Sequence, residues 1–233
     1  MKAIRTTAKI LINFAHLFFP KLCVTCREPL IQAEEQICLE CLCDLPQTNF
    51  HRQEENPVCQ LFMGKVDIVN ASAWLHYEKG TKVQQLIHAF KYYDNRALAY
   101  QMGRQMGMSL QAYIDKETDW LIPVPLHRKR HRQRGYNQSE WICRGLASVI
   151  HVPVYTDGLQ RKTASGTQTD KSIYARWINV QDIFTLKDTQ CLEGKHVLLI
   201  DDVITSGSTL SACAEVLSAI PDIKVSILAL AAA

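Results

Sequence analysis

The sequence lacks an excess of charge of one sign, a long apolar run and any internal repeat. Lys and Arg number 26 against 23 Asp and Glu, and a net charge of +3 is too even to argue by itself for a nucleic-acid partner. The apolar stretch at residues 10–19 contains Asn13 and His16 and is far shorter than the ~20 residues that a membrane span needs. No small-residue cleavage site follows it, so we interpret residues 1–20 as a short amphipathic helix. We therefore expect no integral membrane segment and a cytoplasmic location.

The composition is that of an ordinary globular protein. With 233 residues, 47% of them hydrophobic, the chain can bury a sizeable core, and its length suits one domain with a small appendage. Because no secretory signal is evident, the nine cysteines are expected to be reduced, and disulfides explain them poorly.

Four cysteines form two CxxC pairs within "CVTCREPLIQAEEQICLEC", at Cys23, Cys26, Cys38 and Cys41. Each pair places two thiolates on one tight turn, and two such turns complete the tetrahedral four-sulfur shell that zinc prefers. A full shell leaves no open position, so the spacing predicts a structural zinc site. Cys43 and His51 lie near enough to replace one ligand, and Cys59 is a remoter substitute.

Beyond an irregular stretch at 47–64, segments that read as strands and helices alternate. Strands are expected at 66–78, 119–124, 152–155, 196–200 and 224–231, and helices at 81–94, 96–114, 137–150 and 208–220. This alternation predicts an α/β fold with a mostly parallel sheet and helices on both faces. We expect two domains, a helix and zinc module with linker at 1–64 and the sheet domain at 65–233.

Two acids and a run of small residues follow the strand at 196–200. Asp201 and Asp202 precede "TSGST", which comprises Thr205, Ser206, Gly207, Ser208 and Thr209, and then a helix. Small residues let backbone N–H groups curl inward, and a helix N-terminus favours anions, so the loop suits a phosphate. Carboxylates only accept hydrogen bonds, so the acids suit a vicinal diol or hydrated magnesium. A ribose 5-phosphate combines the diol and the phosphate.

Residues 197–209, "VLLIDDVITSGST", resemble the phosphoribosyl-pyrophosphate (PRPP) motif of type I phosphoribosyltransferases. With the cysteine pairs, "PVPLHRKRHRQRGYNQSE" and "RKTASGTQTDKSIYARWIN", the sequence is similar to the ComF/GntX family over nearly its whole length. That family joins an N-terminal four-cysteine zinc module to a phosphoribosyltransferase domain and includes proteins required for DNA uptake in naturally competent bacteria. The resemblance therefore implies a type I phosphoribosyltransferase-like sheet.

The resemblance also implies roles for particular residues. Asp201 and Asp202 would hold the ribose hydroxyls and magnesium, and the loop 205–209 would hold the 5-phosphate. Arg128, Lys129 and Arg130 follow a strand where such enzymes bind pyrophosphate, and residues 161–172 occupy the position of a mobile loop that closes over the site. The sequence ends directly after its last expected strand, so the resemblance assigns no residues to orient an acceptor.

The basic run at 127–134, "HRKRHRQR", has a second interpretation. Five of its eight residues are Arg or Lys, and such a run can follow the phosphates of single-stranded DNA, with Tyr136 and Trp141 as stacking faces. Arg132, Arg134 and Tyr136 are therefore candidate DNA contacts. A basic run that serves only nucleotide phosphates, or none, remains an alternative.

Three functions stay open. The chain is a phosphoribosyltransferase with an unidentified acceptor, a non-catalytic single-stranded-DNA-binding competence factor, or a regulator that senses PRPP without turnover. Transfer would break the bond to pyrophosphate through an oxocarbenium-like state, which requires cations and exclusion of water rather than a nucleophile. No Ser-His-Asp set is evident, and we interpret His76, His151 and His196 as structural or surface residues.

Overall fold

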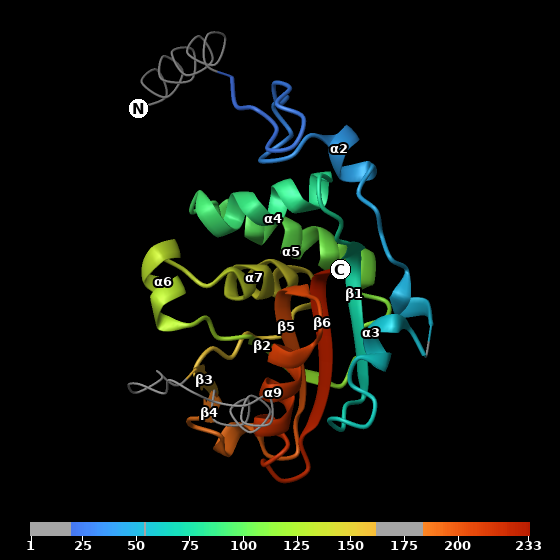
Figure 1. The fold of residues 1–233 in the computed structure, drawn as a ribbon, viewed down its shortest axis with the longest axis vertical. Coiled ribbons are helices and arrows are strands. Elements are labelled where there is room, and N and C mark those ends of the chain that lie inside the picture. The colour runs from blue at the N-terminus through green and yellow to red at the C-terminus, as the bar shows by residue number, and fades with distance from the viewer. Residues whose placement is uncertain (1–19, 54, 162–183) are drawn as a thin grey trace, which may run out of the picture. The chain divides into compact units, whose positions relative to one another are not determined.

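The computed structural model describes residues 20–53, 55–161 and 184–233 (Figure 1). The chain divides into two compact units, Met1–Leu45 and Pro46–Ala233. The domain division expected between residues 64 and 65 stays a prediction, and the helix expected at 1–20 falls almost wholly outside the described residues. No helix in the described ranges has the length and apolar character to cross a membrane.

The first unit is built on tight turns and one short helix. Leu22 and Pro29 form an antiparallel bridge that closes the first CxxC turn. Arg27 completes this turn at φ 66°, a left-handed conformation unusual for a residue with a side chain. The helix α2 (Leu39–Cys43) contains Cys41, and Cys38, the first cysteine of the second pair, is its N-cap.

A four-stranded parallel sheet forms the centre of the second unit. Its order is β1 (Asn70–His76), β6 (Lys224–Ala232), β5 (His196–Ile204) and β2 (Thr118–Pro123). The central strands β5 and β6 are nearly continuous apolar runs, as expected of parallel strands covered on both faces. The predicted parallel sheet is confirmed.

Helices cover both faces of this sheet (Figure 1). The helix α9 (Ser208–Leu217) packs with Val197 and Leu199 of β5 in one apolar cluster. Because side chains alternate along a strand, Leu198 and Ile200 face the opposite side. That side is covered by α5 (Arg96–Leu110) and α7 (Gln138–Ile150), next to α4 (Lys82–Tyr92).

Glycines allow α5 and α7 to pack closely. A Cβ built at Gly103 would lie 2.2 Å from the Ile142 carbonyl oxygen, and one at Gly145 would lie 2.0 Å from the Tyr100 carbonyl oxygen. Neither position has room for a side chain, so glycine is required where the two helices approach each other.

Some elements differ from the sequence-based expectation. The strand expected at 152–155 is reduced to a single parallel bridge between Leu121 and Val154. The basic run forms a short helix, α6 (Arg128–Arg134), which ends at Gly135 with φ 74°. An unexpected antiparallel pair joins β3 (Leu159–Arg161) and β4 (Phe184–Leu186). The remaining short elements are α3 (Pro57–Gln60), η1 (Phe50–Arg52) and η2 (Gln190–Leu192).

Candidate functional site

The carboxyl end of β5 runs into the hydroxyl-rich loop and then into α9. β5 extends to Ile204, so Asp201 and Asp202 lie within the strand rather than after it. Gly207 caps α9 at φ 73°, a conformation that a residue without a Cβ adopts readily. Thr205, Ser206, Ser208 and Thr209 are exposed around it, and the first N–H groups of α9 have no acceptor within the helix. This end of the sheet therefore presents N–H and hydroxyl donors to an anion.

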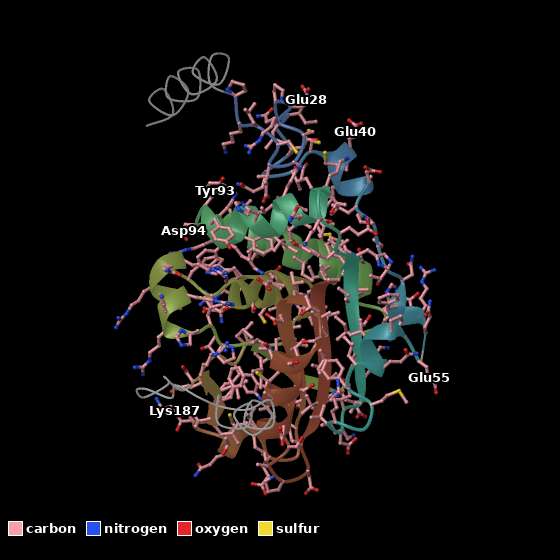
Figure 2. All side chains as sticks on the ribbon, viewed as in Figure 1. Glu28, Glu40, Glu55, Tyr93, Asp94 and Lys187 are labelled. Atoms are coloured by element: carbon pink, nitrogen blue, oxygen red, sulfur yellow. The ribbon has the colours of Figure 1, made fainter. Side chains whose placement is uncertain are left out.

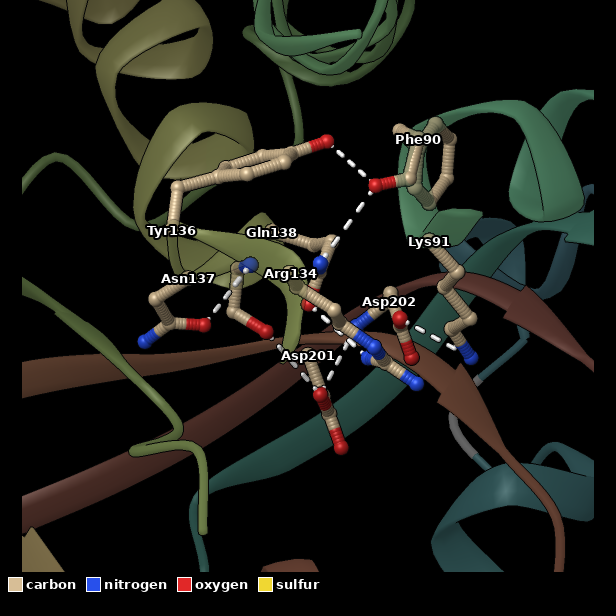
Figure 3. A network of polar contacts seen from close by, with 9 residues as sticks. Phe90, Lys91, Arg134, Tyr136, Asn137, Gln138, Asp201 and Asp202 are labelled. Carbon is tan, nitrogen blue, oxygen red and sulfur yellow. Dashed lines mark hydrogen bonds and ion pairs between the residues drawn. The ribbon is translucent and has the colours of Figure 1, made fainter. Parts of the chain in front are cut away.

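Asp201 is held from one side and open on the other (Figure 3). Its Oδ1 accepts a hydrogen bond from the Ser139 hydroxyl at 3.0 Å and another from the Asp202 N–H at 2.9 Å. Its second carboxylate oxygen points away from both donors. Burial, followed by the neighbouring Asp202 charge, raises the pKa of Asp201 from 3.8 to about 7. Near neutral pH this carboxyl group is therefore poised between its two protonation states.

Asp202 has a different environment from Asp201. It is buried, with 8% of its surface exposed, and its Oδ2 forms an ion pair with Lys91 Nζ of α4 at 2.9 Å. Asp202 therefore does not face solvent at the strand end, because Lys91 in the last turn of α4 packs against it.

A cavity of about 330 Å³ opens beside these acids. Four cationic side chains line it together with both acids, namely Lys91, Arg130, Arg134 and Arg161. Thr205 and Thr209 bring the hydroxyl-rich loop into the same cavity. The pocket thus combines carboxylate acceptors, hydroxyl donors and positive charge, and so suits a ligand with both hydroxyl and phosphate groups.

The basic helix α6 presents only part of its charge to this pocket. Arg130 and Arg134 lie one helical turn apart on one face and line the cavity, whereas Arg128 and Lys129 do not line it and are exposed. Arg132 is also exposed.

Tyr136 is buried and cannot stack on a nucleic-acid base. It is 4% exposed, and its hydroxyl donates to the Phe90 carbonyl (Figure 3). The interpretation of this residue as a stacking face is therefore corrected, because its ring is packed inside the protein.

Two residues of the pocket region lay beyond sequence reasoning, and a third, Arg161, was expected only as the first residue of the mobile loop at 161–172. Lys91 reaches the site from α4 and Ser139 from the first turn of α7. Arg161 ends β3, and the rest of the expected mobile loop, 162–172, lies outside the described residues. Asn137 caps α7: its side chain accepts from the Ser139 N–H at 3.2 Å and donates to the Val124 carbonyl at 3.0 Å. This cap holds α7 against the end of β2 and positions Ser139.

The four predicted cysteines come together in the first unit. The sulfur atoms of Cys23, Cys26, Cys38 and Cys41 all lie within 4.8 Å of one another, and all are free thiols in the structure. Cys43 is exposed and outside this group. The substitute ligands are engaged elsewhere: the Cys59 thiol bonds the Ala71 carbonyl at 3.1 Å, and the His51 ring packs on Tyr113.

The geometry of this cluster fits zinc. Zn–S bonds of about 2.3 Å in a tetrahedron place sulfurs about 3.8 Å apart, and Cys26 Sγ lies 3.7 Å from Cys38 Sγ. Backbone N–H groups support the sulfurs, since the Cys38 N–H donates to Cys23 Sγ and the Cys41 N–H to Cys38 Sγ, each at 3.4 Å. Such bonds stabilise thiolate charge and orient ligands. The cluster can hold a zinc ion with four protein ligands.

Curated relatives match most of the chain, although no protein-family model does. The DNA utilization protein YhgH of Shigella flexneri is 27% identical over 223 residues, 86% of this chain and 92% of the relative. The competence protein ComFC of Bacillus subtilis is 23% identical over 82% of this chain and 75% of its own length. The competence protein F of Haemophilus influenzae is 30% identical over 137 residues, 57% of this chain and 60% of its own. These relatives are DNA utilization and competence proteins, and an assignment to the ComF family fits them.

Solved structures similar to this chain include the adenine phosphoribosyltransferase of Saccharomyces cerevisiae, at 14% identity and a TM-score of 0.38 over 61% of this chain and 72% of that one. The structure confirms the predicted α/β architecture of a parallel sheet with flanking helices, with a four-cysteine group near the N-terminus.

Proposed function

We propose that this ComF-family chain binds PRPP together with magnesium at the carboxyl edge of its sheet and acts in DNA uptake. The observation that carries this proposal is the composition of one pocket, which joins two carboxylates, a hydroxyl-rich helix N-terminus and four cationic side chains. PRPP has the complementary groups: a ribose diol, a 5-phosphate and a pyrophosphate. The names of the curated relatives, DNA utilization and competence proteins, support the biological setting.

The roles follow from the position of each group. The open oxygen of Asp201, with Asp202, would hold the ribose hydroxyls and magnesium, and residues 205–209 would hold the 5-phosphate. Arg130, Arg134 and Arg161 would bind the pyrophosphate, because they are cations that line the pocket. Among the described residues that line it, the two acids are the only anionic side chains. Bound magnesium would supply charge neutralisation for the departing pyrophosphate. Whether an acceptor takes the ribosyl group separates a transferase from a PRPP-sensing regulator.

Calorimetry with Mg²⁺ and PRPP tests the site. Asp201→Asn/Asp202→Asn should abolish magnesium-dependent binding, because both charged acceptors are lost, and Asp94→Asn serves as an exposed acidic control that should bind normally. Pyrophosphate release with a panel of bases, ammonia donors and single-stranded DNA then tests turnover. Undiminished binding by the double variant would refute the proposed site.

The two faces of α6 offer a sharper test. Arg130→Ala/Arg134→Ala removes the cations that line the pocket, whereas Arg128→Ala/Arg132→Ala removes two exposed cations of the same helix. Only the first pair should weaken PRPP binding. Equal losses in the two double variants would indicate a general electrostatic effect rather than direct contact.

A second candidate function is binding of single-stranded DNA, and one surface favours it. Tyr92 and Tyr93 at the end of α4 are 65% and 70% exposed, and the His88 ring lies 4.4 Å from that of Tyr92. Figure 2 shows Tyr93 and Asp94 at this end of α4. The Arg134 guanidinium lies 5.9 Å from the Tyr92 ring centroid, which joins the aromatic group to α6. Exposed rings beside a basic stripe are the usual platform for unpaired bases.

Fluorescence anisotropy with a labelled oligonucleotide at several salt concentrations tests this surface. Tyr92→Ala/Tyr93→Ala should weaken binding about tenfold or more through lost stacking, while Met63→Ala, which removes an exposed large side chain elsewhere, should not. Arg128→Ala/Arg132→Ala should flatten the plot of log affinity against log salt by about 1.4 units, at ~0.7 per phosphate contact. No measurable binding by the wild type at low salt would exclude direct DNA binding.

A further inference from the structure

A second cavity, of about 320 Å³, lies at the other edge of the sheet and is separate from the residues of the proposed PRPP pocket. It opens between the amino-terminal parts of the strands and the end of α5. Ser72 of β1, Thr118 of β2 and Ser226 of β6 line it together with Leu110 and Leu198. The amino edge of the sheet therefore carries a pocket lined by both hydroxyl and apolar groups.

Several polar atoms in this cavity lack a partner within the described part of the chain. Ser72 Oγ, Thr118 Oγ1 and His51 Nδ1 are buried and form no hydrogen bond there. Ser72 and Thr118 are 7% and 6% exposed. Buried polar groups are nearly always hydrogen-bonded, and an unsatisfied one is costly. Three unsatisfied groups lining one cavity indicate that something in the cavity, a ligand or water, completes their bonding.

The charges around the cavity restrict the ligand. No Lys or Arg lines it among the described residues, and Asp115 is its one carboxylate. Nearby lysines are paired with acids, Lys195 with Asp119 at 3.0 Å and Lys224 with Glu117 at 3.8 Å. Phosphates and carboxylates are therefore disfavoured. Burial, followed by the Arg52 charge, lowers the pKa of His51, so its ring is neutral at pH 7 and offers both a donor and an acceptor.

Two aromatic rings, tilted by 59° against each other, lie among the residues that line the cavity. The rings of His51 and Tyr113 lie 4.4 Å apart, and the Arg52 guanidinium lies 6.0 Å from the Tyr113 ring centroid. Tyr113 is 48% exposed, so one of its surfaces is available to a ligand. We propose that this cavity binds a neutral heterocycle of the purine or pyrimidine class, free or as a nucleoside, whose ring packs on Tyr113 and whose polar edge bonds the unpartnered hydroxyls.

Asp115 and Ser226 line the cavity, and with the buried His196, which does not line it, they lie in the order of a catalytic triad. Asp115 Oδ2 lies 3.4 Å from His196 Nδ1, and His196 Nε2 lies 2.9 Å from Ser226 Oγ. Ser226, however, lies on β6 between β1 and β5, where backbone N–H groups are committed to the parallel ladders. No pair of N–H donors is left there to stabilise an oxyanion. The trio is therefore not an acyl-transfer site, and Asp115 and Ser226 contribute polar groups to the cavity wall.

The direct experiment is calorimetry of the full-length protein with adenine, hypoxanthine, adenosine and cytidine. At least one should bind saturably at one site per chain. Indole, which is flat and similar in size to a purine but has one donor, should bind at least tenfold more weakly, because it leaves the hydroxyls unsatisfied. Saturable binding by none of the four, or equal binding by indole, would overturn the proposal and leave the cavity to water.

Variants locate the binding. Thr118→Val keeps the side-chain shape and removes the hydroxyl, and should weaken binding about tenfold. Ser211→Ala removes another unpartnered buried hydroxyl, on α9, and should bind as the wild type does. Asp201→Asn should also bind normally, since it belongs to the other pocket. Loss of binding in Asp201→Asn, unchanged binding in Thr118→Val, or covalent labelling of Ser226 by a fluorophosphonate would each contradict the proposal.

Discussion

Ionisation of Asp201 should lower the free energy of unfolding as the pH rises, and Asp201→Asn should remove this pH dependence. Its pKa is raised from 3.8 to about 7 by burial and by the charge of Asp202. One pKa unit corresponds to about 1.36 kcal/mol, so ionising this group in the folded state lowers the free energy of unfolding by about 4 kcal/mol. The stabilisation that the protonated Asp201 contributes to the folded state is fully present below pH 4 and is lost as the pH rises through 7. Between pH 5 and 8 the loss should be about 3 kcal/mol.

Urea denaturation between pH 5 and 8 measures this effect. Asp201→Asn cannot ionise and keeps the side-chain shape, so its free energy of unfolding relative to the wild type should rise by about 3 kcal/mol over this range. The variant should therefore be the more stable protein at pH 8, although it lacks a group that we assign to ligand binding. Such an exchange of stability for function is common in binding sites.

Asp202→Asn is the matched control from the adjacent position. At pH 5, where Asp201 is protonated, this change breaks the ion pair with the half-buried Lys91 and should destabilise the protein by about 1–2 kcal/mol. Because it also removes one of the two causes of the raised pKa of Asp201, the dependence of stability on pH should become shallower. If the wild type and Asp201→Asn show parallel pH dependences from pH 5 to 8, the reasoning is wrong.

Three further predictions follow from other parts of the structure. Purified protein should contain about one zinc per chain, and Cys23→Ser should lose the metal and solubility together, as measured by metal analysis; full zinc in that variant would contradict the four-sulfur site. Gly145→Ala should destabilise the protein by about 3 kcal/mol in urea, because its Cβ would meet backbone at 2.0 Å, and by more than Gly107→Ala, whose Cβ would meet side chains at 3.0–3.3 Å. The affinity for Mg²⁺ and PRPP should rise about tenfold from pH 6 to 8 as Asp201 ionises from about 10% to about 90%, and a flat calorimetric profile would exclude a role for its charge.

The sequence alone was enough for features that depend on neighbouring residues. The spacing of Cys23 and Cys26, and of Cys38 and Cys41, encodes two turns whose sulfurs can converge, whatever the rest of the chain does. The run from Val197 to Thr209 specifies a buried strand, a small-residue loop and a helix start, because apolar periodicity and small residues act locally. Local patterns therefore predicted the sheet, most of its helices and the hydroxyl-rich loop.

The tertiary structure decided which side chains meet across long separations in the sequence. Nothing local to Lys91 or Ser139 indicates that they reach Asp202 and Asp201, because only the packing of α4 and α7 against β5 brings them there. The sequence of the basic run gives its charges but not which of them share the helix face that lies toward the pocket. In the structure, Arg130 and Arg134 lie on that face.

The same reason accounts for Tyr136 and for the second cavity. A tyrosine beside arginines has the composition of a nucleic-acid contact, yet burial against Phe90 depends on how α4 and α7 pack. His196 and Ser226 start neighbouring strands that are separated along the chain by the whole of α9, and only the parallel register of β5 and β6 brings them together. The sequence by itself thus determined the local elements and the metal site. The tertiary structure decided the electrostatics of each pocket, because burial and pairing are properties of packed surfaces and not of local sequence.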